Sequence, residues 1–120
     1  MHKTQLHLKD DIQRCIEACS SCHDDCLEAV PHCLSMGGAH AEPGHVRLLL
    51  DCAEICQTAA SFMLRHSDLH ERTCLVCADV CDACATACER FDDPRMKSCA
   101  ASCRECADAC RRTAAIPIAA

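Results

Sequence analysis

Apolar and cysteine residues recur three or four positions apart along most of this chain, with charged residues between them. The pattern is plainest from Cys74 to Cys88, where five Cys lie at intervals of three, four, three and four residues. At ~3.6 residues per turn, these side chains fall on one face of a helix. Such a face normally carries Leu, Ile and Val and packs into a bundle core. The spacing therefore predicts a helix whose core-facing side is made of thiols.

The same period predicts three further helices, and no segment alternates apolar and polar residues as a strand would. Short connections between four helices favour an antiparallel up-down-up-down arrangement. We therefore predict an all-α protein, a four-helix bundle with a Cys-lined core, that forms one domain over residues 1–120. The expected helices cover residues 4–36, 43–65, 68–91 and 94–114.

Proline and capping residues mark the expected helix boundaries. Pro31 is expected to kink or interrupt the first helix, because it lacks a backbone N–H and its ring crowds the preceding turn. Asp68 and Glu71 fit a capping box at the start of the third helix. Asp93 fits the N-cap of the fourth helix, with Pro94 at its first position.

Composition explains why the thiols have to be buried. Leu, Ile, Val and Phe together supply only 21 of the 120 residues, which is little material for a core. The 16 Cys fill that deficit, because a free Cys behaves as a small hydrophobic residue and is among the most buried residue types.

Charge and chain ends narrow the classes of partner. The net charge is −6 and the chain has two aromatic residues, so nucleic acid is not an expected partner. No apolar run is long enough to span a membrane, and the N-terminus lacks the apolar stretch of a secretory signal. These features predict a cytoplasmic protein, where thiols stay reduced.

Disulfides between Cys residues of one helix are not expected. Cβ atoms three or four residues apart on a helix lie roughly 5–6 Å apart, against about 3.8 Å in a disulfide.

Thiolates select soft metals, namely Cu(I), zinc or the iron of iron–sulfur clusters. Zinc and iron–sulfur sites normally use closed sets of four ligands, whereas these Cys form unbroken rows. Rows suit Cu(I), because each thiolate can bridge two ions and loading can approach roughly one ion per Cys. The candidate ligands are Cys15, Cys19, Cys22, Cys26, Cys33, Cys52, Cys56, Cys74, Cys77, Cys81, Cys84, Cys88, Cys99, Cys103, Cys106 and Cys110.

The same residues bear on three other functions. A zinc or iron–sulfur module with a few discrete sites and a thiol redox buffer both stay open as alternatives. A di-iron enzyme of the four-helix type is not expected, because it needs two inward Glu-x-x-His motifs and only Glu42 and His45 have that spacing. We expect no enzymatic activity.

The Cys rows resemble those of the bacterial copper storage protein family, in its cytosolic branch that lacks a signal peptide. The resemblance covers nearly the whole chain. It implies a homotetramer of bundles, each holding many Cu(I) ions on inward thiolates, with uptake at one open end lined by His or Met. The implied partners are copper ions and further copies of the chain, together with a copper chaperone or cuproenzyme that exchanges copper with the store.

Helix geometry suggests where copper enters. In an antiparallel bundle with ~1.5 Å rise per residue, Met63, His66 and His70 come out at the level of Cys15, at one end. These three are the predicted uptake residues. The opposite end offers Met36, His40 and His45, and the surface is expected to carry the remaining four His, namely His2, His7, His23 and His32.

Overall fold

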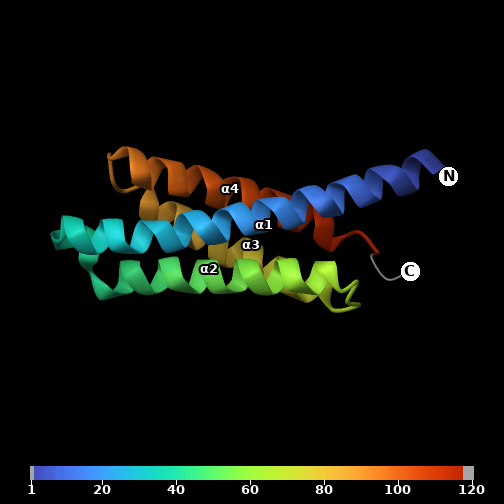
Figure 1. The fold of residues 1–120 in the computed structure, drawn as a ribbon, viewed down its shortest axis with the longest axis horizontal. Helices are drawn as coiled ribbons and strands as arrows, with labels where there is room; N and C mark the ends of the chain where they lie inside the picture. The colour runs from blue at the N-terminus through green and yellow to red at the C-terminus, as the bar shows by residue number, and fades with distance from the viewer. Residues whose placement is uncertain (1, 118–120) are drawn as a thin grey trace.

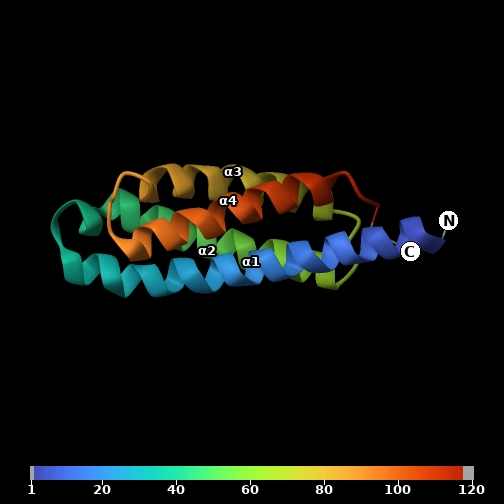
Figure 2. The same cartoon turned by 90° about the horizontal axis from the view of Figure 1, so that it is seen from above.

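Four long helices lie lengthwise beside one another in this protein (Figures 1 and 2). The computed structural model describes residues 2–117, with side chains from residue 9 onward, so Met1 and residues 118–120 of the predicted domain lie outside the described residues. The elements are α1 (His2–Met36), the short 3-10 helix η1 (Gly38–Ala41), α2 (Pro43–Leu64), α3 (His70–Cys88) and α4 (Pro94–Ala114).

Each helix packs against two neighbours. α1 lies against α2 and α4, and α3 lies against the same two helices from the opposite corner. The molecule measures 53 × 21 × 17 Å, and the N-terminal part of α1 extends past the other helices (Figure 1). This arrangement confirms the prediction of an all-α four-helix bundle. Within residues 2–117, no helix combines the length and apolarity needed to cross a membrane.

The core between the helices is built of Cys and Ala, with a few larger side chains. All 16 Cys are at most 1% exposed. The largest fully buried apolar side chains are Leu49, Met63 and Met96, and Ala residues such as Ala78 and Ala107 fill the space beside the thiols. Small side chains allow the four helices to approach closely, which brings sulfur atoms of different helices together.

Pro31 does not end the first helix, which continues to Met36. The proline removes one backbone hydrogen bond, the one that its N–H would have donated to the carbonyl of Leu27. Both residues lie on the exposed side of α1, with Leu27 43% exposed, so water can satisfy that carbonyl. The interruption considered from the sequence is therefore absent, and Cys33 keeps its place on the buried face.

The connection between α2 and α3 differs from the expected capping box. His66 adopts a left-handed conformation (φ 58°), Ser67 N donates to Phe62 O (3.0 Å), and His66 N donates to Met63 O (3.1 Å), so the end of α2 forms a Schellman motif. The turn then continues to Leu69, the residue before α3, and no side chain caps that helix. The predicted box of Asp68 and Glu71 does not form, since the chain is still turning at residue 68.

The start of α4 follows the sequence prediction. Asp93 is the N-cap, and its carboxylate accepts a hydrogen bond from Met96 N at 3.3 Å. Pro94 occupies the first turn, where its missing N–H costs no hydrogen bond. The N-cap prediction is confirmed.

Candidate metal centre

The thiols of different helices meet because antiparallel neighbours are in matching register. On α1 and α4, Cys15 faces Cys110 and Cys26 faces Cys99. Residue numbers therefore rise along α1 in the direction in which they fall along α4. On α2 and α3, Cys52 faces Cys81 in the same way. Spacings of three and four residues on each helix place one thiol in nearly every turn. The result is a stack of sulfur layers along the bundle axis.

Sulfur atoms contact one another almost continuously along this stack. Consecutive Sγ atoms in the following series lie 3.6–3.9 Å apart, and the series crosses repeatedly between the four helices: Cys15, Cys110, Cys19, Cys106, Cys56, Cys81, Cys52, Cys22, Cys103, Cys26 and Cys99. All 16 Cys are free thiols. The separations are close to the ~4 Å expected for three sulfurs around one ion at a metal–sulfur distance of about 2.3 Å.

The thiols form overlapping groups of four rather than separate sites. Within each group the Sγ atoms lie within 4.8 Å of one another, and successive groups share two members. Cys22 and Cys52, for example, belong to one group with Cys56 and Cys81 and to another with Cys26 and Cys103. A closed zinc site needs four ligands of its own. Shared ligands instead favour a metal that accepts bridging thiolates.

Burial works against ionisation of these thiols when no metal is bound. Desolvation raises the pKa of Cys33 to about 11, because the thiolate would have to form without water. The pKa of Cys103 is also raised, by its hydrogen bonding to neighbouring thiols such as Cys22 and by burial. A neutral thiol packs as an apolar group, so the metal-free core forms without the desolvation cost of a buried charge.

The two ends of the sulfur stack differ. At one end Cys33 Sγ donates to Met96 Sδ at 3.8 Å, a thioether where the rest of the stack has thiols. At the other end Cys15 lies against Cys110. The structure thus places all the predicted Cys on one axis, including Cys33 beyond Pro31.

The predicted uptake residues do not behave alike. Met63 is 1% exposed and His70 is 5% exposed, so both reach the core, whereas the His66 side chain is exposed. The two ring nitrogens of His70 lie 3.3 Å from carbonyl oxygens, Nδ1 from Ser67 O and Nε2 from Thr113 O. A cavity of about 300 Å³ lined by His70, Asp68 and residues of the C-terminal segment opens at this end.

Two His at the opposite end are wholly or partly removed from solvent. His45 is 4% exposed, and neither ring nitrogen has a hydrogen-bond partner among the described residues, while burial lowers its pKa. His32, expected at the surface, is half-buried and its Nε2 lies 2.8 Å from Asp93 Oδ2. The position of His32, next to Cys33 in the sequence, does not predict this contact with Asp93. The contact depends on how α1 packs against the α3–α4 turn. Side chains of residues 1–8, including His2 and His7, lie outside the described part.

Known proteins share both the sequence pattern and the fold. The sequence profile of the family described as copper storage protein matches residues 8–115. The Nmul_A1745 protein of Nitrosospira multiformis is similar in structure, with TM-score 0.85 and 47% identity over 89% of this chain and 97% of that chain. A Cu(I)-bound form of the copper storage protein BsCsp3 has TM-score 0.82 and 37% identity, over 88% of this chain and 99% of that one.

A third similar structure is that of a cytosolic copper storage protein from Streptomyces lividans, which holds five coppers. It has TM-score 0.79 and 29% identity, over 91% of this chain and 96% of that chain. All three likenesses extend over nearly the full length of the bundle, so they include every helix that carries the thiol stack.

Proposed function

Because this chain belongs to the copper storage protein family, we propose that its thiol stack stores Cu(I), bound as many ions per chain to inward Cys thiolates. One observation supports this above the others. Successive groups of four thiols share members from Cys110 and Cys19 to Cys84 and Cys99, which suits a metal that bridges from sulfur to sulfur. Copper is the cargo of this protein, and the Cys residues are its binding sites.

All 16 Cys are proposed as copper ligands, with a loading of about one ion per Cys. Each thiol loses its proton when copper binds, so loading releases protons and weakens as the pH falls. The uncharged thiol core becomes a core of thiolates neutralised by Cu(I). Cys33 differs from the others, because its sulfur contact is the Met96 thioether and a thioether cannot supply a negative charge.

Storage fits this site better than the alternatives. A zinc or iron–sulfur module would separate its Cys into sets of four, and the shared groups do not separate. A redox buffer needs accessible thiols of low pKa, whereas these are buried. We propose storage without catalysis, since successive sulfurs of the stack already contact one another, as at 3.6 Å between Cys19 and both Cys106 and Cys110.

Single Cys substitutions test the bridging arrangement. Cys103 Sγ lies within 3.9 Å of the sulfurs of Cys22, Cys26 and Cys52, whereas Cys33 Sγ contacts the Met96 thioether at 3.8 Å. Cys103→Ser should lower the copper capacity by about two ions, because a bridging thiolate serves two ions, and Cys33→Ser by at most about one. Copper bound per chain after desalting under nitrogen measures both. Equal losses in the two variants would indicate independent sites.

We propose that Cu(I) enters beside Met63 and His70, with His66 at the rim. Asp68 and Glu71 line the same cavity as His70 and attract cations. His70→Gln should slow copper uptake by roughly tenfold, the scale of losing one supporting group at a metal site, and leave the final capacity unchanged. Stopped-flow transfer from a coloured Cu(I) complex measures the rate, with His23→Gln as the control, because His23 is also half-buried and its Nδ1 lies 2.9 Å from Asp24 Oδ1 on α1. Unchanged uptake in His70→Gln together with slow uptake in His45→Gln would assign uptake to the opposite end.

We further propose a cytoplasmic homotetramer that exchanges copper with a copper chaperone or cuproenzyme. The Streptomyces relative is described as cytosolic, which supports the location. Exposed apolar side chains on the outer faces of the helices, which support assembly, are Leu27, Leu34, Leu50, Leu64, Leu75 and Val76.

A further inference from the structure

Two imidazoles and one carboxylate converge beyond the Cys33 end of the sulfur stack. His32 Nε2 lies 2.8 Å from Asp93 Oδ2, and His40 Nε2 lies 2.9 Å from Asp93 Oδ1. The three side chains come from α1, η1 and the α3–α4 turn, which are remote in sequence. They are 27%, 15% and 20% exposed, so the cluster is half-buried and water can still reach it.

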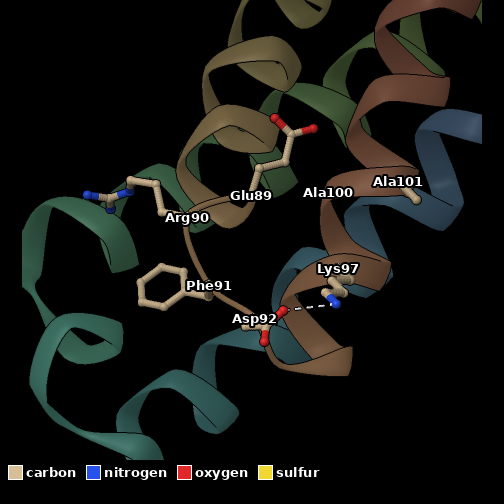
Figure 3. Close-up of a pocket in the computed structure, with 7 residues that line it drawn as sticks. All are labelled: Glu89, Arg90, Phe91, Asp92, Lys97, Ala100 and Ala101. Atoms are coloured by element: carbon tan, nitrogen blue, oxygen red, sulfur yellow. Dashed lines mark ion pairs between the residues drawn. The ribbon is translucent and has the colours of Figure 1, made fainter.

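Local backbone features hold the cluster in place. Gly37 and Gly38 both have positive φ (70° and 55°), which ends α1 and turns the chain back so that His40 returns beside His32. The ring of Phe91 projects from the α3–α4 turn (Figure 3) and packs against the His40 ring, with centroids 4.1 Å apart. Neither His is therefore a freely moving surface side chain.

The cluster lies next to the storage core but has different ligand chemistry. Met96 connects the two, because its backbone N–H is bonded to Asp93 while its Sδ contacts Cys33 Sγ at 3.8 Å. Thiolates select Cu(I), whereas two imidazoles with a carboxylate are typical ligands of borderline divalent ions such as Zn²⁺. The two ligand sets would therefore sort ions by softness.

The geometry points to a second metal site, in which His32, His40 and Asp93 bind one divalent cation of the Zn²⁺ type. Ligand atoms about 2.0–2.2 Å from a tetrahedral ion lie roughly 3.3 Å from one another. The observed nitrogen–oxygen separations of 2.8 and 2.9 Å need to open by only about half an ångström. Each Nε2 gives up its proton to the solvent or to Nδ1 as the ion binds, and water completes the coordination.

Such an ion would join α1, η1 and the start of α4 at one end of the bundle. In its absence the same three groups are held by two N–H donations to one carboxylate. The carboxylate stays ionised, since the hydrogen bond from His40 and that from His32 lower the pKa of Asp93 to about 2. The site is thus preformed, and a cation replaces protons rather than assembling the ligands.

The test uses the tag-free full chain, first saturated with Cu(I) so that the thiols are occupied, with copper per chain measured in each sample. Equilibrium dialysis against buffered Zn²⁺ then counts additional ions. Wild type and the control His23→Gln should each bind one Zn²⁺ per chain. His40→Gln and Asp93→Asn should bind it at least about tenfold more weakly. Gln keeps a donor for Asp93, and Asn is itself a good N-cap, so both variants should fold.

Co²⁺ in place of Zn²⁺ identifies the ligands. The proposal expects visible bands of nitrogen and oxygen ligation in wild type, absent in His40→Gln, without sulfur-to-cobalt charge transfer. Three results would overturn it: no additional ion in wild type, equal Zn²⁺ binding in His40→Gln, or a cobalt spectrum of thiolate ligation. Because copper content is measured first, a failure of copper storage is seen separately.

Discussion

Protein loaded with Cu(I) is expected to keep its helices at denaturant concentrations that fully unfold the empty protein. An ion that binds only the folded state, at a free concentration 100 times its dissociation constant, adds about 2.7 kcal/mol to the free energy of unfolding. A domain of this size has only about 5–15 kcal/mol in total. The stabilisation that ten or more ions would add along the thiol stack therefore exceeds the intrinsic free energy of unfolding of the bundle.

Helical circular dichroism in increasing urea, under nitrogen, measures this effect. The empty protein should be folded before denaturant is added, because neutral thiols pack as apolar side chains. Addition of an excess of a strong Cu(I) chelator to the loaded sample should restore the unfolding midpoint of the empty protein, which serves as the control. Identical midpoints with and without copper would mean that copper does not bind within the folded core.

Raising the pH should destabilise the empty bundle steeply and leave the copper-loaded bundle almost unaffected. The pKa of a Cys in an unfolded chain is about 8.5, whereas burial raises the pKa of folded Cys33 to about 11. Between these values the folded state holds a proton that the unfolded state has lost. The stabilisation is therefore complete below about pH 8.5 and declines as the pH rises toward 11.

Between these two pKa values, the free energy of unfolding of the empty protein falls by about 1.4 kcal/mol per pH unit for each such thiol. Cys103, whose pKa is also raised, adds to it. Urea unfolding at several pH values from 8 to 11 measures the effect, and the loaded protein is the control, since its thiolates have already lost their protons to copper. The chain has no Tyr and only three Lys, so few other groups titrate in this window. A flat stability curve for the empty protein would refute the neutral thiol core.

The thiol stack was predictable because helix geometry converts sequence spacing directly into position. The five Cys between positions 74 and 88 lie on one face of their helix, however that helix packs against its neighbours. Because the chain has few other large apolar residues, this face must point inward. Short connections then fix the antiparallel order, which brings Cys15 beside Cys110 and Cys52 beside Cys81. Period and composition together were sufficient for the fold and for the burial of the Cys.

The features that sequence did not indicate depend on contacts between elements or on backbone detail. His32 and Asp93 are 61 residues apart, and only the packing of α1 against the α3–α4 turn brings them together. The left-handed conformation of His66 occupies a position where Gly is usual, so residue type pointed away from it. Pro31 stays within α1 because it lies on the exposed side, a fact that tertiary packing decides.

An anaerobic titration of fully reduced protein with Cu(I), in competition with a chromogenic chelator, tests the storage function most directly. The chelator is expected to remain colourless until the added copper approaches the number of thiols, 16 per chain. A plateau at a few ions per chain would contradict it, since the shared groups of four would then act as a few closed sites and the chain would not be a bridged copper store.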